Sequence, residues 1–346
     1  MTDSAIAWSA IGLLGPGIWI AALVGASGAI AALMPRFGRF AIAVPTVRSS
    51  HSTLTPQWGG LAVVSATITV AALAIFLSPR FGAETVSQTI VVLLAAVLMV
   101  ALGVVDDLRN LAPPYKLAVQ AVAVTLVIVA LPDDMRVLPF VPLWLEQALL
   151  FLSGLWFVNL VNFMDGVDWM MVVEVVPVTA GVALVGALGA LPPEGLVVAL
   201  ALNGAMLGFD PFNRPVARLF LGDMGSLPTA LLLTWLLVLV AGSGHLAAAL
   251  LLPLYFVGDA SMTLLRRLGA GERVWEAHRS HFYQRAGDNG FSNGEIVGRV
   301  LAVNLGLVAL AGVSVIYTAP AVGIAAVALG AALVAWLLMS FSKARP

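Results

Sequence analysis

The sequence contains no cysteine among its 346 residues. Without thiols the protein cannot form disulfides, thiolate nucleophiles, iron–sulfur clusters or cysteine-ligated zinc sites, whatever the redox compartment. A bound metal ion would therefore use oxygen or imidazole ligands.

Charged residues are also scarce. They make up only 10% of the chain, and 17 Lys and Arg nearly balance 18 Asp and Glu. This balance leaves no net field to attract nucleic acid or an acidic protein partner. Hydrophobic residues make up 61% of the chain, far above the roughly 45–50% of soluble domains. The composition predicts an integral membrane protein.

Uncharged apolar runs of about 20 residues predict transmembrane helices. The sequence has about eleven such runs, or ten if the last apolar stretch is one helix that Pro320 does not divide. We therefore expect one all-α domain over residues 1–346, folded as a polytopic bundle of membrane-spanning helices. The predicted spans are 6–34, 59–77, 85–105, 117–131, 143–163, 171–191, 195–208, 226–243, 245–265, 295–317 and 321–341.

The distribution of basic residues predicts the orientation, because cytoplasmic loops collect Lys and Arg. Fifteen of the 17 basic residues follow odd-numbered spans or lie in the C-terminal tail, whereas Arg80 and Arg136 fall on the other side. This pattern predicts a periplasmic N-terminus and a cytoplasmic C-terminus. The cytoplasmic loops are then approximately 35–58, 106–116, 164–170, 209–225 and 266–294.

These five loops carry nearly all the unusual polar residues, so one membrane face gathers the candidate chemistry. The first loop contains His51 and, further on, Gly59 and Gly60. Paired glycines permit close backbone approach to a ligand or to another helix. An ordinary junction between a loop and a helix explains this stretch equally well.

The second loop begins with Asp106 and Asp107 at the end of an apolar span. An aspartate at the bilayer centre costs about 2.5–3.5 kcal/mol, and less near the interface, so an adjacent pair indicates a function. Neighbouring helical residues point about 100° apart. We expect one aspartate to face a substrate or metal and the other a basic partner, Arg109 or Lys116. The alternative is an interfacial charge pair.

The third polar cluster extends from the preceding span into the third loop, and its polar residues recur every three positions. Where helical, this spacing gives one polar stripe, made of Asn159, Asn162, Asp165 and Asp168. Gly166 indicates a break in that helix. Oxygen-bearing side chains without a nearby basic partner suit a hard cation such as Mg²⁺. Interhelical hydrogen bonding is the alternative interpretation.

The fourth loop places Asp223 in a Gly-flanked turn just before a span, with Asn213 upstream. This aspartate is suited either to a cation that also bridges phosphates or to capping the helix. In the fifth loop, His278, His281 and Arg285 would share one face of a helix and suit a diphosphate. A solvated amphipathic helix on the membrane surface is the alternative. For Asp259 in the preceding span we favour a salt bridge or hydrogen bond over catalysis.

Five motifs in this order resemble the polyprenyl-phosphate N-acetylhexosamine-1-phosphate transferases, glycosyltransferase family 4. The closest resemblance is to the bacterial O-antigen-initiating branch, which is related to the phospho-MurNAc-pentapeptide transferase. The motifs are RSSHSTLTPQWGG, DDLRNLAPPYKLAVQ, NFMDGVD, PFNRPVARLFLGDMGS and VWEAHRSHFYQR.

The resemblance implies transfer of a sugar 1-phosphate from a UDP-N-acetylhexosamine to undecaprenyl phosphate, which yields UMP and a diphosphate-linked lipid. This is the first membrane step of O-antigen or cell-envelope glycan synthesis. The resemblance also implies an inner-membrane location, an active site facing the cytoplasm, Mg²⁺ with Mn²⁺ as an alternative, and compatibility with a homodimer. UDP-GlcNAc, UDP-GalNAc and 6-deoxy sugars all remain open as donors.

The resemblance assigns roles residue by residue. A lipid phosphate is already largely ionised, so the need for a general base stays open. Catalytic roles fall on Asp106, Asp107, His278 and His281, substrate contacts on Asp165, Asp168, Asn213, Arg285, Lys116 and His51, and metal ligation on Asp223 and Asn162.

Two residues depart from the family pattern. Gln57 stands where the family usually has Arg, and Trp169 stands where its DGxDG motif has Gly. Trp169 would narrow the sugar pocket, provide a stacking surface or impair activity. The competing interpretations are a transporter or flippase for lipid-linked sugars, which would use membrane carboxylates as ion sites, and a catalytically inactive homologue.

Overall fold

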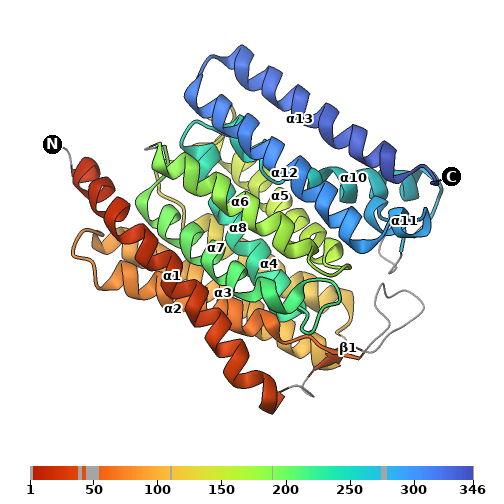
Figure 1. The fold of residues 1–346 in the computed structure, drawn as a ribbon. Helices are drawn as coiled ribbons and strands as arrows, with labels where there is room; N and C mark the ends of the chain where they lie inside the picture. The colour runs from red at the N-terminus through yellow and green to blue at the C-terminus, as the bar shows by residue number, and fades with distance from the viewer. Residues whose placement is uncertain are drawn as a thin grey trace.

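The computed structural model describes residues 3–37, 41–43, 54–109, 111–188, 190–273 and 279–345. Within these ranges the chain forms a helical bundle with one short two-stranded antiparallel sheet (Figure 1). The elements are α1 (Asp3–Phe37), β1 (Ile42–Ala43), β2 (Thr55–Pro56), α2 (Gly59–Phe76), α3 (Ala83–Arg109), α4 (Pro113–Val129), α5 (Leu143–Met164), α6 (Met170–Ala187), α7 (Pro193–Asn213), α8 (Asp223–Gly242), α9 (Leu246–Leu251), α10 (Leu254–Gly269), α11 (Phe282–Asp288), α12 (Asn293–Ile316) and α13 (Pro320–Phe341).

The prediction of an all-α membrane bundle is confirmed. In the described part of the chain, nine helices are long and apolar enough to span a membrane. The two remaining predicted spans correspond to α4, which has 17 residues, and to α9 together with α10. The predicted span 245–265 is therefore not one helix. It breaks at Leu252 and Pro253, where proline lacks the N–H that a continuous helix needs.

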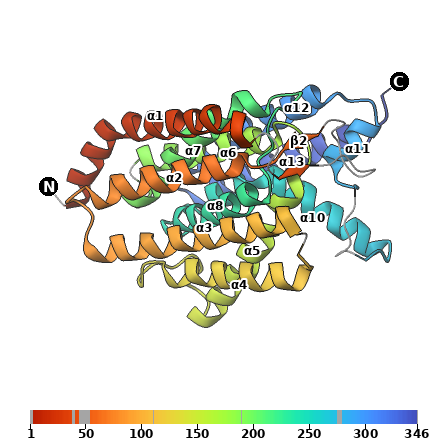
Figure 2. The same ribbon diagram turned by 90° about the horizontal axis from the view of Figure 1, so that it is seen from below.

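Helices α7 and α8 form the centre of the bundle. Most of α8 is buried, and it packs against α2, α3 and α5, while α7 packs against α1, α2 and α6. Figure 2 shows α1 and α4 on opposite sides of this centre. Small residues allow the close crossings: a Cβ on Gly204 of α7 would lie 2.3 Å from the backbone oxygen of Trp19 in α1.

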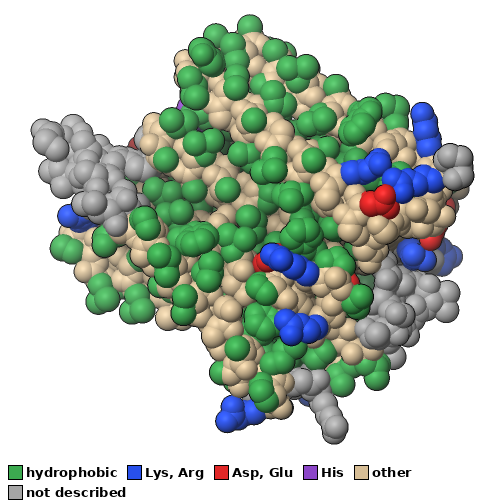
Figure 3. All heavy atoms as spheres, viewed as in Figure 1, with side chains coloured by type: hydrophobic (Ala, Val, Ile, Leu, Met, Phe, Trp, Pro, Cys, Tyr) green, Lys and Arg blue, Asp and Glu red, His purple; other side chains and the backbone are tan. Residues whose placement is uncertain are grey.

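Outer helices expose apolar side chains, as expected where a protein contacts lipid. Leu14 and Val24 of α1, Val129 of α4 and Ile324 of α13 are each more than half exposed. Figure 3 shows hydrophobic side chains spread across one face of the molecule, with a group of Lys and Arg side chains at its right-hand edge. Exposed apolar surface on this scale indicates a membrane environment.

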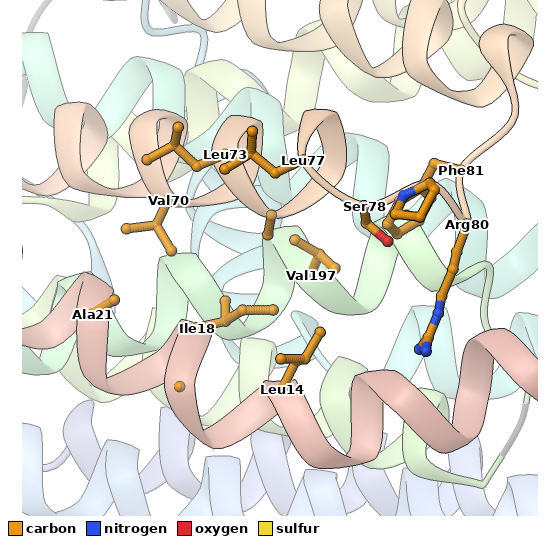
Figure 4. Close-up of a pocket in the computed structure, with 13 residues that line it drawn as sticks. Leu14, Ile18, Ala21, Val70, Leu73, Leu77, Ser78, Arg80, Phe81 and Val197 are labelled. Carbon is orange, nitrogen blue, oxygen red and sulfur yellow. The ribbon is translucent and has the colours of Figure 1, made fainter.

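The two exceptions to the basic-residue pattern have distinct surroundings at the end of the bundle where α2 ends and α3 begins. Arg136 donates a 2.5 Å hydrogen bond to the buried carboxylate of Glu146. Arg80 lies at one end of an apolar cavity of about 590 Å³, which Leu14 and Ile18 of α1 and Leu73 of α2 line (Figure 4). One of the two positive charges is thus neutralised within the fold.

Candidate active site

At the other end of the bundle, α2, α3 and α8 meet with their backbones in contact. The amide of Gly60 donates a 2.8 Å hydrogen bond to the carbonyl of Leu221. Neither Gly60 nor Gly103 has space for a side chain. A Cβ atom added to Gly60 would lie 2.1 Å from the Cα of Gly225, and one added to Gly103 would lie 2.3 Å from the amide nitrogen of Met224. The Gly59-Gly60 pair therefore serves an approach to another helix, one of the two alternatives open from the sequence.

Because Gly103 lies one turn before Asp107, this contact brings the Asp107 carboxylate to the start of α8. Its Oδ1 accepts hydrogen bonds from the amide of Asp223 at 3.3 Å and from Nε2 of Gln57 at 3.1 Å. Its Oδ2 accepts one from the amide of Met224 at 3.1 Å. Asp107 thus binds the positive end of the α8 dipole and fixes where α8 begins.

Asp106 has a different environment, as expected for adjacent residues on a helix. Its carboxylate forms an ion pair with Lys116 of α4 and accepts a 2.8 Å hydrogen bond from the amide of Leu111. The predicted basic partner is therefore Lys116 and not Arg109. The Asp106 carboxyl group also lies within hydrogen-bonding reach of the Asp223 carboxyl group.

Asn162, near the end of α5, completes this group. Its Nδ2 donates hydrogen bonds to Oδ1 of Asp223 at 2.8 Å and to the hydroxyl of Ser226 at 2.9 Å. Side chains from α3, α5 and α8 thus converge at the ends of three apolar helices. We name this set the aspartate cluster; its members are Asp106, Asp107, Asn162 and Asp223.

The aspartate cluster has a donor set suited to Mg²⁺. Mg²⁺ usually keeps several waters and binds through one or two carboxylates together with substrate phosphates, without a complete protein cage. In the described part of the chain, no three His, Asp or Glu side chains form a metal site by themselves. The adjacent Asp106 and Asp223 carboxylates nevertheless offer oxygen ligands whose mutual repulsion a cation would relieve.

Helix α5 ends at Met164, so the predicted break near Gly166 is confirmed. The polar stripe expected where the segment is helical is limited to Asn159 and Asn162, because Asp165 and Asp168 lie beyond the helix. Asn159 also turns away from the cluster, toward Gln120 of α4, to which it donates a 2.8 Å hydrogen bond. The helix ends two residues before Gly166, so only the first two polar residues of the series are helical.

Asp165 lies next to the aspartate cluster in the loop after α5. Burial, and then the negative charges of Asp107 and Asp168, raise the pKa of Asp165 to about 7. The carboxyl group is thus partly protonated at neutral pH, and a nearby cation would favour its ionised form.

A second polar group lies beside the first and consists of Trp169, Asp210, Asn213 and Arg214; we name it the tryptophan corner. The indole N–H of Trp169 donates to Asp210, which also forms an ion pair with Arg214. The Arg214 guanidinium lies 5.7 Å from the centre of the indole ring. The positive and negative charges of this corner thus balance within the protein.

The backbone explains the departure at Trp169 from the family pattern. Its φ is +70°, in the left-handed region that glycine adopts without steric cost. Oδ1 of Asn213 accepts a 2.9 Å hydrogen bond from the Trp169 amide, and Nδ2 of Asn213 donates to the carbonyl of Leu219 at 3.0 Å. Asn213 therefore holds a turn that would otherwise favour glycine. Asp168 accepts a 3.0 Å hydrogen bond from the amide of Ala217.

The fifth loop is organised by Asp259 of α10. Its carboxylate accepts hydrogen bonds from the amides of Phe282 at 2.9 Å and Tyr283 at 3.0 Å, and it lies 3.2 Å from Nδ1 of His281. The sequence interpretation of Asp259 as a salt-bridge or hydrogen-bonding residue is confirmed. This carboxylate satisfies the first amides of α11, which is the next helix of the chain.

His281 precedes α11 in an extended conformation. The predicted helical face is therefore wrong for His281 and Arg285, because α11 begins only at Phe282. His278 lies outside the described residues, as does His51 of the first loop. The sequence offered no signal for this boundary, since the N-cap is a histidine and not Ser, Thr, Asp or Asn.

Sequence reasoning overlooked Arg266 as a site residue. Its Nη2 donates to the carbonyl of Ser280, its guanidinium lies 5.1 Å from the ring centre of Phe282, and its buried Nη1 has no partner in the described part of the chain. Burial, together with the positive charge of Arg285, lowers the pKa of Arg266. Two guanidinium groups near each other, one with an unused donor, form a place for an anion.

The structure thus brings together most of the residues that the sequence singled out. Tyr283 connects the two halves of the site, because its hydroxyl donates a 3.2 Å hydrogen bond to the carbonyl of Phe163 at the end of α5. One group contains Asp106, Asp107, Lys116, Asn162 and Asp223, with Asp165 beside it. Asn213 belongs to the tryptophan corner, and Asp168 precedes Trp169 and binds the amide of Ala217. His281 and Arg285 belong to the α11 region.

Comparison with known proteins identifies the family that the chain resembles. The sequence model described as glycosyl transferase family 4 matches residues 89–241. Decaprenyl-phosphate N-acetylglucosaminephosphotransferase of Mycobacterium tuberculosis is 31% identical, over 90% of this chain and 83% of the relative. The probable undecaprenyl-phosphate N-acetylglucosaminyl 1-phosphate transferase of Bacillus subtilis is 27% identical, over 71% and 69%. Phospho-N-acetylmuramoyl-pentapeptide-transferase of Streptococcus gordonii is 28% identical, over 69% and 76%.

Proposed function

Because the chain belongs to the polyprenyl-phosphate N-acetylhexosamine-1-phosphate transferase family, we propose that it transfers an N-acetylhexosamine 1-phosphate from a UDP-sugar to undecaprenyl phosphate. The products are UMP and an undecaprenyl diphosphate that carries the sugar. The reaction takes place in the bacterial inner membrane, at the cytoplasmic surface. UDP-N-acetylglucosamine is the first donor to test, because two relatives are named for N-acetylglucosamine.

One observation carries the proposal: carboxylates from separate helices converge where apolar spans end. Asp106 and Asp223 lie within hydrogen-bonding reach, and Asp107 binds the first amides of the helix that begins with Asp223. Such a concentration of negative charge is costly near a membrane and typical of a functional site. The ends of membrane spans are expected near the membrane surface, where a lipid phosphate can meet a soluble nucleotide.

The proposed reaction is a direct displacement at the β-phosphorus of the UDP-sugar. An oxygen of the lipid phosphate forms the new P–O bond, and the bond between the β-phosphorus and the bridging oxygen breaks, so that this oxygen leaves with UMP. Phosphoryl transfer of this kind needs little covalent work from the protein and much positioning. The nucleophile is a phosphate monoester with a second pKa of about 6, so the proposal includes no general base.

Asp223 and Asn162 are the proposed metal ligands, and Asp107 has a positioning role. When bound, Mg²⁺ would neutralise diphosphate charge and orient the phosphates for in-line attack. Asp107 holds the start of α8 through two amides, which fixes the backbone that carries Asp223. Nδ2 of Asn162 contacts Asp223, which leaves the amide oxygen of Asn162 as its ligand atom.

The cations around the cluster supply anion contacts. Lys116, paired with Asp106 at the start of α4, is placed to meet the lipid phosphate. Nη1 of Arg266, which has no hydrogen-bond partner among the described residues, and the guanidinium of Arg285 suit the oxygens of the diphosphate. His281, held by Asp259, lies beside them.

The test is UMP release by the purified protein with undecaprenyl phosphate, Mg²⁺ and a panel of UDP-N-acetylhexosamines. We expect metal-dependent and lipid-dependent UMP from one donor, and its loss with EDTA or in Asp223→Ala. The matched control is Asp134→Asn, which changes an exposed aspartate between α4 and α5. Absence of UMP with every donor from well-folded protein would contradict the proposal, and normal turnover in Asp223→Ala would overturn the metal assignment.

A further inference from the structure

A basic pocket lies at the corner where α11, α12 and the end of α13 meet, apart from the aspartate cluster. It has a volume of about 410 Å³ and is lined by Phe291, Arg299, Trp336, Lys343 and Arg345, among others. Lys and Arg side chains gather at this corner of the surface, beside the C-terminus (Figure 3). The pocket shares no lining residue with the aspartate cluster or the tryptophan corner.

Aromatic stacking holds two of the cations in place. The guanidinium of Arg299 lies 4.7 Å from the ring centre of Phe291, and that of Arg345 lies 4.2 Å from the same ring. Nη1 of Arg299 also donates a 3.0 Å hydrogen bond to the hydroxyl of Ser340. The two guanidinium groups are therefore ordered before any ligand arrives, which reduces the entropy cost of binding an anion.

The positive charges of the pocket exceed its negative charges. Arg345 forms a 2.7 Å ion pair with Glu295, which balances one cation. The nearby carboxylate of Asp288 is paired with Arg279, at 3.3 Å. In the part of the chain that the structure describes, no ion pair involves Arg299 or Lys343. Two positive charges thus remain available to an anion.

The surroundings of the pocket indicate a ligand that is apolar as well as anionic. Helix α13 has no charged residue among its 22 residues, and Lys343 follows its end by two residues. Trp336 and Met339 in its last two turns are 56% and 59% exposed. Tryptophan at the end of a membrane span is typical of the headgroup region. A soluble anion would gain nothing from these two side chains.

We propose that the basic pocket binds an anionic phospholipid of the surrounding leaflet, with the phosphate at Arg299 and Lys343 and an acyl chain along Trp336 and Met339. Charge complementarity selects the anionic headgroup, and the exposed apolar surface selects a membrane lipid. Basic pockets between spanning helices bind anionic headgroups by the same physics. This inference is independent of the proposed transferase activity.

Hydrogen bonds connect the residues near the pocket to the end of α11. Nδ2 of Asn289, just after α11, donates a 2.7 Å hydrogen bond to the carbonyl of Phe341, and the amide of Arg345 donates one of 3.1 Å to the carbonyl of Asn289. The lipid site and the end of α11 therefore share a backbone connection.

The test is binding of phosphatidylglycerol to the full-length protein in non-ionic detergent, measured by native mass spectrometry with phosphatidylcholine as the zwitterionic reference. We expect preferential retention of phosphatidylglycerol. Lys343→Gln should weaken its binding about fivefold and Arg299→Gln/Lys343→Gln about 25-fold, since each basic residue near a membrane surface contributes about 1 kcal/mol. Neither variant should change phosphatidylcholine binding.

The matched control is Arg36→Gln, which removes one exposed positive charge at the end of α1, at the same end of the bundle. This variant should bind phosphatidylglycerol as the unchanged protein does. Equal retention of the two phospholipids, or an equal loss in Arg36→Gln, would overturn the proposal. Displacement of phosphatidylglycerol by an equal amount of undecaprenyl phosphate would overturn it too, because the pocket would then be an acceptor site.

Discussion

The aspartate cluster and the tryptophan corner lie side by side and have opposite charge balance. In the aspartate cluster, three carboxylates share one ion pair, that of Asp106 with Lys116. In the tryptophan corner, the single carboxylate of Asp210 meets both a guanidinium and an indole N–H. The charges of the tryptophan corner are therefore neutralised by protein groups. The aspartate cluster has an excess of negative charge, which a bound cation would neutralise.

This difference separates structural polar residues from functional ones more clearly than residue type does. Both groups contain aspartates and asparagines at helix ends, so they look alike in the sequence. A group that satisfies its own charges stabilises a turn. A group that leaves like charges together costs stability and is typical of a site for a cation or substrate.

The largest expected effect comes from neutralising the aspartate cluster. Asp223→Asn should lower UMP formation by at least about 10²–10³-fold, the usual loss when one transition-state contact is removed. The same change should leave the melting temperature in EDTA unchanged or higher, because it removes repulsion with Asp106. Parallel turnover and thermal unfolding measurements check both. A large drop in melting temperature would contradict the contrast between the two groups.

Neutralising the tryptophan corner should have the opposite outcome. Asp210→Asn weakens the pairing with Arg214 and leaves a buried position less well satisfied. The free energy of unfolding should fall by about 1–3 kcal/mol, while turnover per folded molecule at saturating donor stays within a few-fold. Denaturation and steady-state kinetics on the same preparations measure the two effects. Arg214→Gln, which removes the exposed partner, should give a smaller loss of stability.

The raised pKa of Asp165 predicts a pH dependence within the cluster region. Its folded-state pKa is about 7, against an ordinary value of 3.8, so the folded protein binds more protons than the unfolded chain between these pH values. Its contribution to the free energy of unfolding should therefore fall as pH rises from about 4 to about 7, and stay constant above. Asp165→Asn should remove this component in metal-free protein, measured as melting temperature from pH 5 to 8. Identical pH profiles for the two proteins would contradict the prediction.

The smallest expected effect is that of Trp169→Gly. Glycine relieves the left-handed backbone at φ +70°, but the variant loses the indole contacts to Asp210 and Arg214. These effects oppose each other, so we expect a change in the free energy of unfolding of no more than about 1 kcal/mol. Trp169→Phe is the control, because it keeps the strained backbone and the ring but loses the N–H. A change in donor preference only in Trp169→Gly would indicate that the indole borders the sugar site.

The sequence was sufficient to predict the bundle, because an apolar run of span length has few other stable forms. Each predicted span corresponds to helical structure, and the break in 245–265 occurs at Pro253, a visible signal. The sequence was also sufficient to predict that the polar loops lie at one end of the helical bundle. The sequence did not predict pairings between individual side chains. Lys116 and Arg109 were equally good candidates for the basic partner, and only the structure shows that Lys116 pairs with Asp106.

The errors at the site have a common physical origin. The break at Gly166 was predicted, but the residue at which α5 ends was not, and the shared helical face of His281 and Arg285 held only if His281 were helical. In each case, tertiary contacts decide where the helix ends. Tyr283 packs against Gly166, where a Cβ would lie 2.2 Å from the tyrosine hydroxyl, and Asp259 caps α11 from another helix. Local periodicity carries no information about such contacts.

The backbone contacts of Gly60 and Gly103 with α8 also determine how the site responds to its substrates. Most helix pairs meet through side chains, which change rotamer when charge in their surroundings changes. Here the separation between α3 and α8 is set by main-chain atoms, which have no rotamers to change. The helix segments that carry the carboxylates are therefore held at a fixed separation, which would lower the reorganisation energy needed when charge shifts during the reaction. The free-energy cost of bringing the carboxylates together thus arises during folding and does not recur in each catalytic cycle.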